Sequence, residues 1–250
     1  MDGPRGISRA FSMVELLVSL AVIAVLLSLL LPLLIHAKRV STAAVCASNL
    51  RQLGIAWQSY VHDYDQFPQY SQTPEWKYGG AEFVGTERAA VLDPDRPINR
   101  YVREDLVEHD QSLVQLYRCA GDTGVHRRGE RYAPSVLDHG TCYETYGTSY
   151  RANPNIMDSS RAGIDKLRRP LRVTEVGVSA SRLLILADSA WFYATRPQGS
   201  TDAAYEASWH GWQDSGNMLA MDGSVRFVNF ATGLNSQYVL KPRPELTGGE

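Results

Sequence analysis

Apolar residues fill one long stretch near the start of the chain, and polar residues resume after it. Between Phe11 and Ile35 the only formally charged residue is Glu15. Since roughly 20 apolar residues in a helix are enough to cross a bilayer, this pattern predicts a transmembrane helix over 11–36. Pro32 lies within it and is expected to kink or locally melt the helix, because proline has no amide hydrogen.

A helical pattern continues beyond the apolar stretch, over 37–66. Small and apolar residues recur there at steps of three and four, which predicts one buried helical face. These residues are Ala43, Ala47, Leu50, Gly54, Trp57, Val61 and Tyr64. We therefore expect one helix from Phe11 to about residue 62, ending before Phe67 and Pro68, with its soluble second half packed on a head domain.

The remainder of the chain, 67–240, predicts one head domain with short strands. Strands are expected at 171–173, 181–187, 217–220 and 225–229. Asp222-Gly223 separates the last two and predicts a hairpin turn, because these residue types accept positive φ. Segment 70–110 has no clear period and predicts an irregular insertion, and 241–250 predicts a disordered tail. The expected fold class is α+β, with a long N-terminal helix on an antiparallel β-sheet head.

Composition and motifs argue against several classes of function. The formal net charge is −2, and no patch of basic and aromatic residues suggests nucleic-acid binding. None of the six histidines pairs with another at a metal-ligand spacing such as H-x3-H. The sequence also has no G-x-S-x-G elbow, P-loop or Gly-rich dinucleotide fingerprint. We therefore expect no enzymatic activity.

The apolar stretch is too long for an ordinary secretory signal peptide, whose apolar core has about 7–15 residues before a small-residue cleavage site. Two alternatives stay open: a membrane-anchored hydrolase that depends on His210 or Cys119, and an uncleaved, single-span, membrane-anchored periplasmic domain for binding or adhesion. Glu15 argues against the second, because an acid in the bilayer costs about 2.5–3.5 kcal/mol and a lone anchor has no use for one.

The segment Ala10-Phe11-Ser12-Met13-Val14-Glu15-Leu16-Leu17-Val18 resembles the prepilin processing site of type IV pilins and type II secretion pseudopilins. The resemblance implies that 1–10 is a leader, removed by a prepilin peptidase that cuts between Ala10 and Phe11 and methylates Phe11. Glu15 and Pro32 then occupy the fifth and twenty-second mature positions, as in the family. Ala10 departs from the pattern, because the family usually has Gly there.

Three further parts of the chain resemble the prepilin-type proteins of planctomycetes and related bacteria. They are the segment 39–68 with its Cys-x-x-Asn-Leu-Arg-Gln-Leu-Gly core, the pair of segments 117–122 and 148–150, and Trp209-His210 followed by Asp222-Gly223. The last pair is similar to a family signature of His, spacer and Asp-Gly. Its spacer has eleven residues here, against the usual nine.

The resemblance implies a structural role. The subunit is expected in the inner membrane as a single-pass protein with its head in the periplasm. It would polymerise through 11–36 with other pilin or pseudopilin subunits into a type II secretion or type IV pilus-like filament. There, Glu15 of one subunit would face the Phe11 amine of a neighbour, offsetting the desolvation of both charges. Expected partners are the prepilin peptidase, the other subunits and the lipid bilayer, without nucleic acid or a required cofactor.

The head contains few candidates for cross-links or ligands. Cys119 and Cys142 enclose a 22-residue loop and could form a disulfide, although two separate buried thiols are the alternative. Cys46 is interpreted as a small helix residue, and His210 as a packed or turn-capping histidine. Pseudopilin heads often hold calcium in a C-terminal loop, so the resemblance suggests calcium here, with oxygen ligands from Asp202, Asp214 and Asp222.

Overall fold

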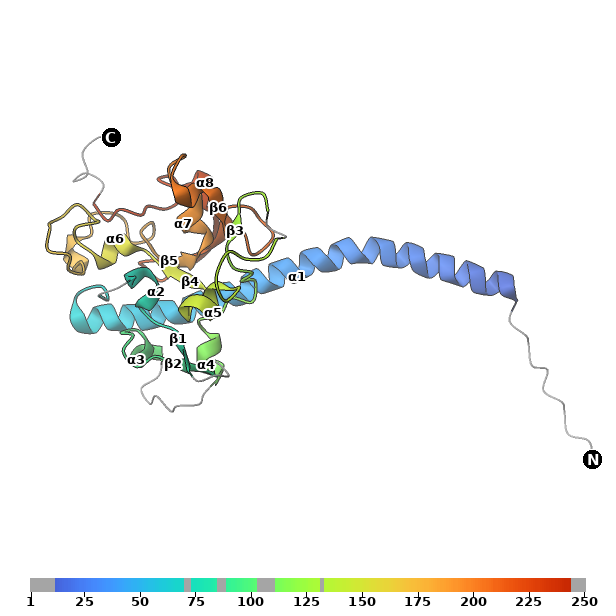
Figure 1. Cartoon of the computed structure of the whole chain (residues 1–250), viewed down its shortest axis with the longest axis horizontal. Helices are drawn as coiled ribbons and strands as arrows, with labels where there is room; N and C mark the ends of the chain where they lie inside the picture. Colours follow the sequence, from blue (N-terminus) through green and yellow to red (C-terminus); the bar gives the residue numbers. More distant parts are fainter. Residues whose placement is uncertain (1–11, 70–72, 85–88, 103–110, 131–132, 244–250) are drawn as a thin grey trace, which may run out of the picture. The chain divides into compact units, whose positions relative to one another are not determined.

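The computed structural model describes residues 12–69, 73–84, 89–102, 111–130 and 133–243 of the chain (Figure 1). It confirms the expected α+β class, with a long N-terminal helix followed by antiparallel strands. The chain divides into two compact units, Met1–Val40 and Ser41–Glu250. The second is called the head unit below.

Figure 1 labels most of the helices and strands of the described residues. In chain order, these helices and strands are α1 (Met13–Tyr64), α2 (Pro74–Lys77), β1 (Ala81–Val84), β2 (Ala89–Leu92), α3 (Asn99–Val102), α4 (Gln111–Gln115), β3 (His126–Arg127), α5 (Cys142–Tyr146), β4 (Tyr150–Ala152), α6 (Pro154–Met157), η1 (Val173–Glu175), β5 (Leu184–Asp188), α7 (Ala190–Ala194), η2 (Thr201–Ala204), β6 (Tyr205–Glu206), β7 (Ser215–Ala220), β8 (Val225–Asn229) and α8 (Phe230–Gly233).

The helix α1 is continuous over 52 residues, close to the predicted length. It runs through Pro32 without a break, so the helix does not melt there. It ends at Tyr64, ahead of Phe67 and Pro68 as expected. The large apolar side chains between Met13 and Ile35 are all exposed within the chain.

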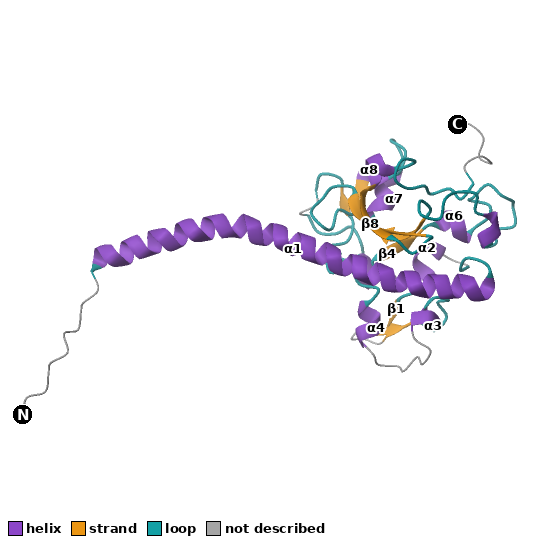
Figure 2. Cartoon of the chain, turned by 180° about the vertical axis from the view of Figure 1, so that it is seen from behind, coloured by secondary structure: helices purple, strands orange, loops and turns teal. Residues whose placement is uncertain are grey.

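The second half of α1 supplies one face of the head core. Its buried residues are Cys46, Leu50, Leu53, Gly54, Ala56, Trp57 and Tyr60. On one side the Trp57 ring lies 5.4 Å from the Tyr78 ring, and on the other Asn217 Nδ2 in β7 donates to the Ala43 carbonyl at 3.0 Å. Figures 1 and 2 show this half of α1 passing between the four-stranded sheet and the group formed by β1, β2, α3 and α4.

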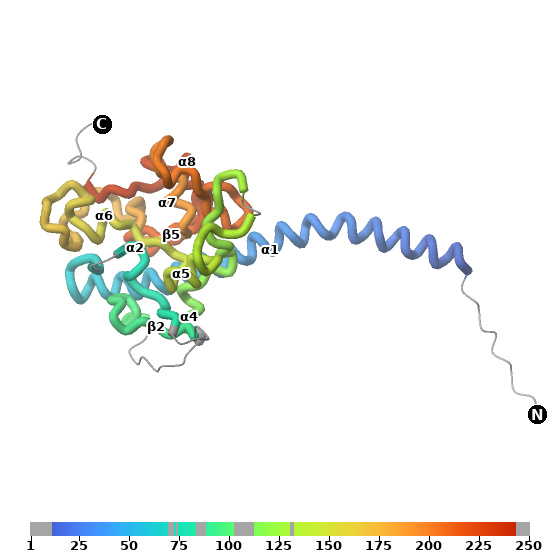
Figure 3. Tube along the Cα trace, in the orientation of Figure 1, coloured from blue at the N-terminus to red at the C-terminus, as the bar shows by residue number. Residues whose placement is uncertain are grey.

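The largest sheet has four antiparallel strands in the order β4-β5-β7-β8. Strands β7 and β8 form the hairpin predicted from Asp222-Gly223. Gly223 has a φ of +83°, and a Cβ there would lie 2.7 Å from Gln58 Nε2 of α1, so both the turn and the contact favour glycine. Two smaller ladders join β1 to β2 and β3 to β6. In Figure 3 the second of these brings a green segment against an orange one.

Two local predictions were wrong. The strand expected at 171–173 is replaced by a 3-10 turn, η1, and Arg172 makes only an isolated bridge with Gln66. The hydrogen bonds of Leu171 explain this. Its amide donates to the Ile156 carbonyl and its carbonyl accepts the Phe67 amide, so it bonds to two different segments rather than to one continuous strand. The segment 70–110, expected to be irregular, contains the antiparallel hairpin β1–β2.

The start of the expected disordered tail is bonded to the head. The Gly177 amide donates to the Pro242 carbonyl at 2.9 Å, and Arg243 Nε donates to the Glu175 carbonyl at 2.6 Å. The rest of the tail, 244–250, lies outside the described residues.

Candidate functional site

The first candidate site is the apolar part of α1. It is long and apolar enough to cross a membrane, and it is the one such helix in the described part of the chain. Glu15 is exposed, and its Oε2 accepts a hydrogen bond from the Ser12 amide at 2.9 Å. This contact caps the first turn of the helix. Ala10 and Phe11, the residues expected to flank the cleavage site, lie outside the described residues.

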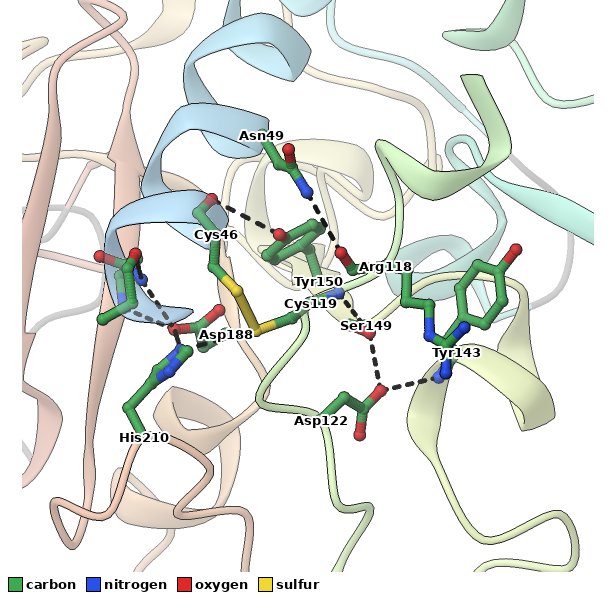
Figure 4. Close-up of a disulfide and its surroundings, with 12 residues drawn as sticks. Cys46, Asn49, Arg118, Cys119, Asp122, Tyr143, Ser149, Tyr150, Asp188 and His210 are labelled. Atoms are coloured by element: carbon green, nitrogen blue, oxygen red, sulfur yellow. Dashed lines mark hydrogen bonds and ion pairs between the residues drawn. A yellow bond between two sulfur atoms is a disulfide. The ribbon is translucent and has the colours of Figure 1, made fainter. Parts of the chain in front are cut away.

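The second candidate site is buried in the head unit, where several segments of the resemblance meet (Figure 4). Cys119 is disulfide-bonded to Cys46 of α1, with a Cα–Cα distance of 5.2 Å, while Cys142 is a free buried thiol. The predicted pairing of Cys119 with Cys142 is therefore wrong, as is the interpretation of Cys46 as a plain helix residue. The physical reason is that Cys46 lies on the buried face of α1 in front of the Cys119 loop.

A histidine–aspartate pair lies against this disulfide. Asp188 is the last residue of β5, and His210 lies in the loop between β6 and β7, and each is only 1% exposed. His210 Nε2 is 3.2 Å from Asp188 Oδ2 and 3.5 Å from Cys119 Sγ. The same Asp188 oxygen accepts the Asn217 backbone amide at 2.7 Å. Because a carboxylate only accepts, Nε2 carries the proton in this pair.

Part of the hydrogen-bonding capacity of the pair is unused. Asp188 Oδ1 and His210 Nδ1 are buried and find no hydrogen-bond partner among the residues that the structure describes. Cys46, Cys119 and His210 offer ligand atoms that all lie within 4.8 Å of one another. A buried carboxylate with an unpaired oxygen is costly unless a positive group compensates it.

A second network holds the loop that carries Cys119. The Cys119 amide donates to Ser149 Oγ at 3.0 Å, and that hydroxyl donates to Asp122 Oδ2 at 2.7 Å. Asp122 also accepts the Gly124, Cys142 and Tyr143 amides. Burial raises the pKa of the Asp122 carboxyl above its usual range, while these hydrogen bonds oppose the rise. Asp122 therefore acts as a structural acceptor that fixes the loop.

The two halves of the His and Asp-Gly signature occupy different surroundings. His210 lies in the buried pair, whereas Asp222 is exposed and its Oδ1 accepts the Ser224 amide at 2.9 Å within the β7–β8 turn. Gly121, in the Cys119 loop, packs directly against the His210 ring. A Cβ there would lie 2.9 Å from His210 Nδ1, so this close approach requires glycine.

The three acids suggested as calcium ligands make separate contacts. Asp214 forms an ion pair with Arg128 at 2.9 Å, Asp202 approaches Arg196 at 3.8 Å, and Asp222 caps its own turn. None belongs to the group of close ligand atoms found among the described residues. Calcium binding by these acids stays a prediction.

Sequence reasoning singled out His210 and Cys119 but missed Asp188 and Asn217. The available signal was the position of Asp188 directly after the apolar run 183–187, which predicts a carboxylate at the end of a buried strand. Comparisons with protein-family models, with curated proteins and with solved structures found no match to the chain.

Proposed function

We propose that this chain is a pilin-like structural subunit. It is held in the inner membrane by α1 with its head in the periplasm, is cleaved between Ala10 and Phe11, and is assembled through the first half of α1. The product is a filament of the type II secretion or type IV pilus kind. Its partners are the prepilin peptidase, the bilayer and other pilin or pseudopilin subunits.

One observation carries the proposal: the two halves of α1 differ in what they expose and bury. The stretch from Met13 to Ile35 exposes its apolar side chains, while the same helix goes on to bury Cys46 to Tyr60 in the head core. At 1.5 Å per residue the exposed stretch is about 34 Å long, slightly more than the roughly 30 Å hydrocarbon layer. Such an apolar surface needs lipid or other apolar helices to cover it.

Glu15 favours assembly over simple anchoring. Its carboxylate lies at the start of this apolar surface, and among the described residues its one hydrogen bond comes from the Ser12 backbone amide. A cleaved neighbour would present a positive amine at Phe11. In an apolar bundle this pair would fix the register of neighbouring subunits, because a shifted register would leave both charges unpaired.

The head supports a structural rather than a catalytic role. His210 is 1% exposed, and its Nε2 lies 3.5 Å from Cys119 Sγ of the disulfide. A general acid or base must reach its substrate directly or through one water. The burial of His210 therefore favours a role in holding the head together.

Mass spectrometry of the mature N-terminus tests processing, using membranes from cells with and without the prepilin peptidase. We expect a chain that begins at N-methylated Phe11 in the first strain and an unprocessed chain in the second. A chain that begins at Met1 in both strains contradicts the proposal and favours the uncleaved anchor.

Glu15→Gln tests assembly separately from processing, because it keeps the side-chain volume and removes the charge. Stranding one member of a buried ion pair costs about 3–5 kcal/mol, so we expect normal cleavage but at least a hundredfold less filament in sheared fractions. Ser28→Ala, a change within the same exposed stretch, is the matched control and should assemble normally. Equal filament yields from Glu15→Gln and the control would rule out the charge pair.

A further inference from the structure

Four potential metal ligands from four separate segments converge in the head core. Cys46 comes from α1, Cys119 from the loop before β3, Asp188 from the end of β5 and His210 from the loop before β7. All four are buried to 99% or more. Figure 4 shows the His210 ring directed at both the disulfide and the Asp188 carboxylate.

We propose that Cys46, Cys119, His210 and Asp188 bind one divalent transition-metal ion of the zinc type when the Cys46–Cys119 disulfide is open. The disulfide and the metal complex are then two alternative forms of one cross-link between α1 and the head. The proposal does not depend on filament assembly, because every ligand lies within the head unit.

Two observed spacings, both from His210 Nε2, fit tetrahedral coordination; the ligand atoms within 4.8 Å of one another are those of Cys46, Cys119 and His210, so Asp188 has to move closer to the sulfur atoms to complete the set. With zinc bond lengths, a tetrahedron places nitrogen and sulfur ligands about 3.5 Å apart and nitrogen and oxygen about 3.3 Å apart. The structure gives 3.5 Å from His210 Nε2 to Cys119 Sγ and 3.2 Å from the same nitrogen to Asp188 Oδ2. Two sulfur ligands need about 3.8 Å, which rotation of the Cys46 side chain supplies once the S–S bond is broken.

The charges also fit such an ion. With the disulfide closed and His210 neutral, Asp188 gives the site a charge of −1, and its Oδ1 has no partner among the described residues. With a divalent ion, two thiolates and the carboxylate, the net charge is again −1. Metal binding therefore adds no net buried charge and provides a positive partner for Asp188. Thiolate and imidazole ligands favour zinc-type ions over calcium or magnesium.

The disulfide is converted into the metal complex in two steps, a reduction and a metal-binding step, and each is balanced in electrons and protons. A dithiol reductant gives two electrons and two protons to the disulfide, so the S–S bond breaks, two thiols form and the reductant leaves as a cyclic disulfide. The divalent ion then displaces one proton from each thiol. His210 coordinates through Nε2, and its ring proton is carried on Nδ1.

The test uses the full chain in detergent, either oxidised or reduced with dithiothreitol and desalted without oxygen. Co²⁺ is added as the probe, because thiolate-to-cobalt charge transfer and tetrahedral d–d bands report this ligand set, and Zn²⁺ is used in competition. We expect one ion per reduced chain and none in the oxidised chain. A reduced chain without the charge-transfer band, or an oxidised chain that binds equally well, overturns the proposal.

Variants assign the ligands. His210→Ala and Asp188→Asn should each weaken Co²⁺ binding at least tenfold, in line with the 10–100-fold effects of disturbing a metal site. Cys142→Ser is the matched control, since Cys142 is a buried thiol outside the disulfide, and it should bind like the wild type. Wild-type affinity in His210→Ala, or a matching loss in Cys142→Ser, contradicts the assignment.

A second measurement needs no variant and so does not depend on variant folding. Reduced wild-type chain is alkylated with iodoacetamide with and without Zn²⁺, and the labelled cysteines are identified by peptide mass spectrometry. Zn²⁺ should slow the labelling of Cys46 and Cys119 at least tenfold and leave Cys142 unchanged. Equal labelling of Cys46 and Cys119 with and without Zn²⁺ overturns the proposal.

Discussion

The Cys46–Cys119 disulfide should contribute a large part of the stability of the head. It joins residues 73 positions apart, so it restricts a long loop in the unfolded chain. The loop-entropy relation gives about 15 cal/mol/K, or about 4.4 kcal/mol at 25 °C, for a loop of this length. Cys46→Ala with Cys119→Ala removes the cross-link without introducing a new polar group into the core.

Loss of packing must be separated from loss of the cross-link. Cys142 is a free thiol as completely buried as Cys46, so Cys142→Ala measures the cost of removing one buried sulfur. The cross-link contribution is the loss in the double variant minus twice the loss in Cys142→Ala. We expect about 4 kcal/mol to remain after this subtraction.

Urea unfolding followed by tryptophan fluorescence measures the effect, since Trp57 and Trp209 are buried in the head. With a urea dependence of about 2–3 kcal/mol per M, the unfolding midpoint should fall by about 1.5–2 M beyond the packing cost. Wild type reduced with dithiothreitol in the presence of a chelator should lose a similar amount. A double variant that loses no more than twice the Cys142→Ala value would refute the reasoning.

Two further predictions concern the core and an ion pair on the head. Gly121→Ala places a Cβ 2.9 Å from His210, so it should lower the free energy of unfolding by about 1–3 kcal/mol. The control, Ala120→Ser, changes an exposed residue and should alter the free energy of unfolding by no more than about 0.5 kcal/mol. Equal urea midpoints for the two variants would contradict the close contact. Hydrogen bonding to Arg169 lowers the pKa of Glu175 from 4.5 to about 2, so its stabilisation is present above pH 4.5 and is lost as the pH falls towards 2. The stability difference between wild type and Glu175→Gln should therefore shrink over this range in urea titrations, and a constant difference would argue against the pair.

Local patterns predicted the elements that depend on local physics. The span of α1 follows from a long apolar stretch and a regular stripe, and the β7–β8 hairpin follows from Asp222-Gly223 between two apolar runs. Both signals lie within a few residues of the structure that they determine. The hairpin β1–β2 was missed because its four-residue strands are too short to show an alternation.

The disulfide depended on tertiary packing, and the sequence prediction chose the wrong partner. Cys119 and Cys142 are close in sequence, but the fold places Cys46 against Cys119. A usable signal was present, because Cys46 lies four residues before Leu50, in register with the buried stripe of α1. Spacing showed which face Cys46 occupies, although it did not identify the loop packed against that face.

Four residues from the segments that carry the family resemblance have one structural property in common. Cys46, Cys119, Ser149 and His210 come from distant parts of the chain and meet where the second half of α1 is fixed in the head. Their side chains are buried. These four residues therefore concern how the second half of α1 is held in the head core and carry no information on what the head contacts. Under the proposed function, specificity for cargo or for another subunit would come from exposed parts of the head, such as the surface of the segment around β1 and β2, which the resemblance does not cover.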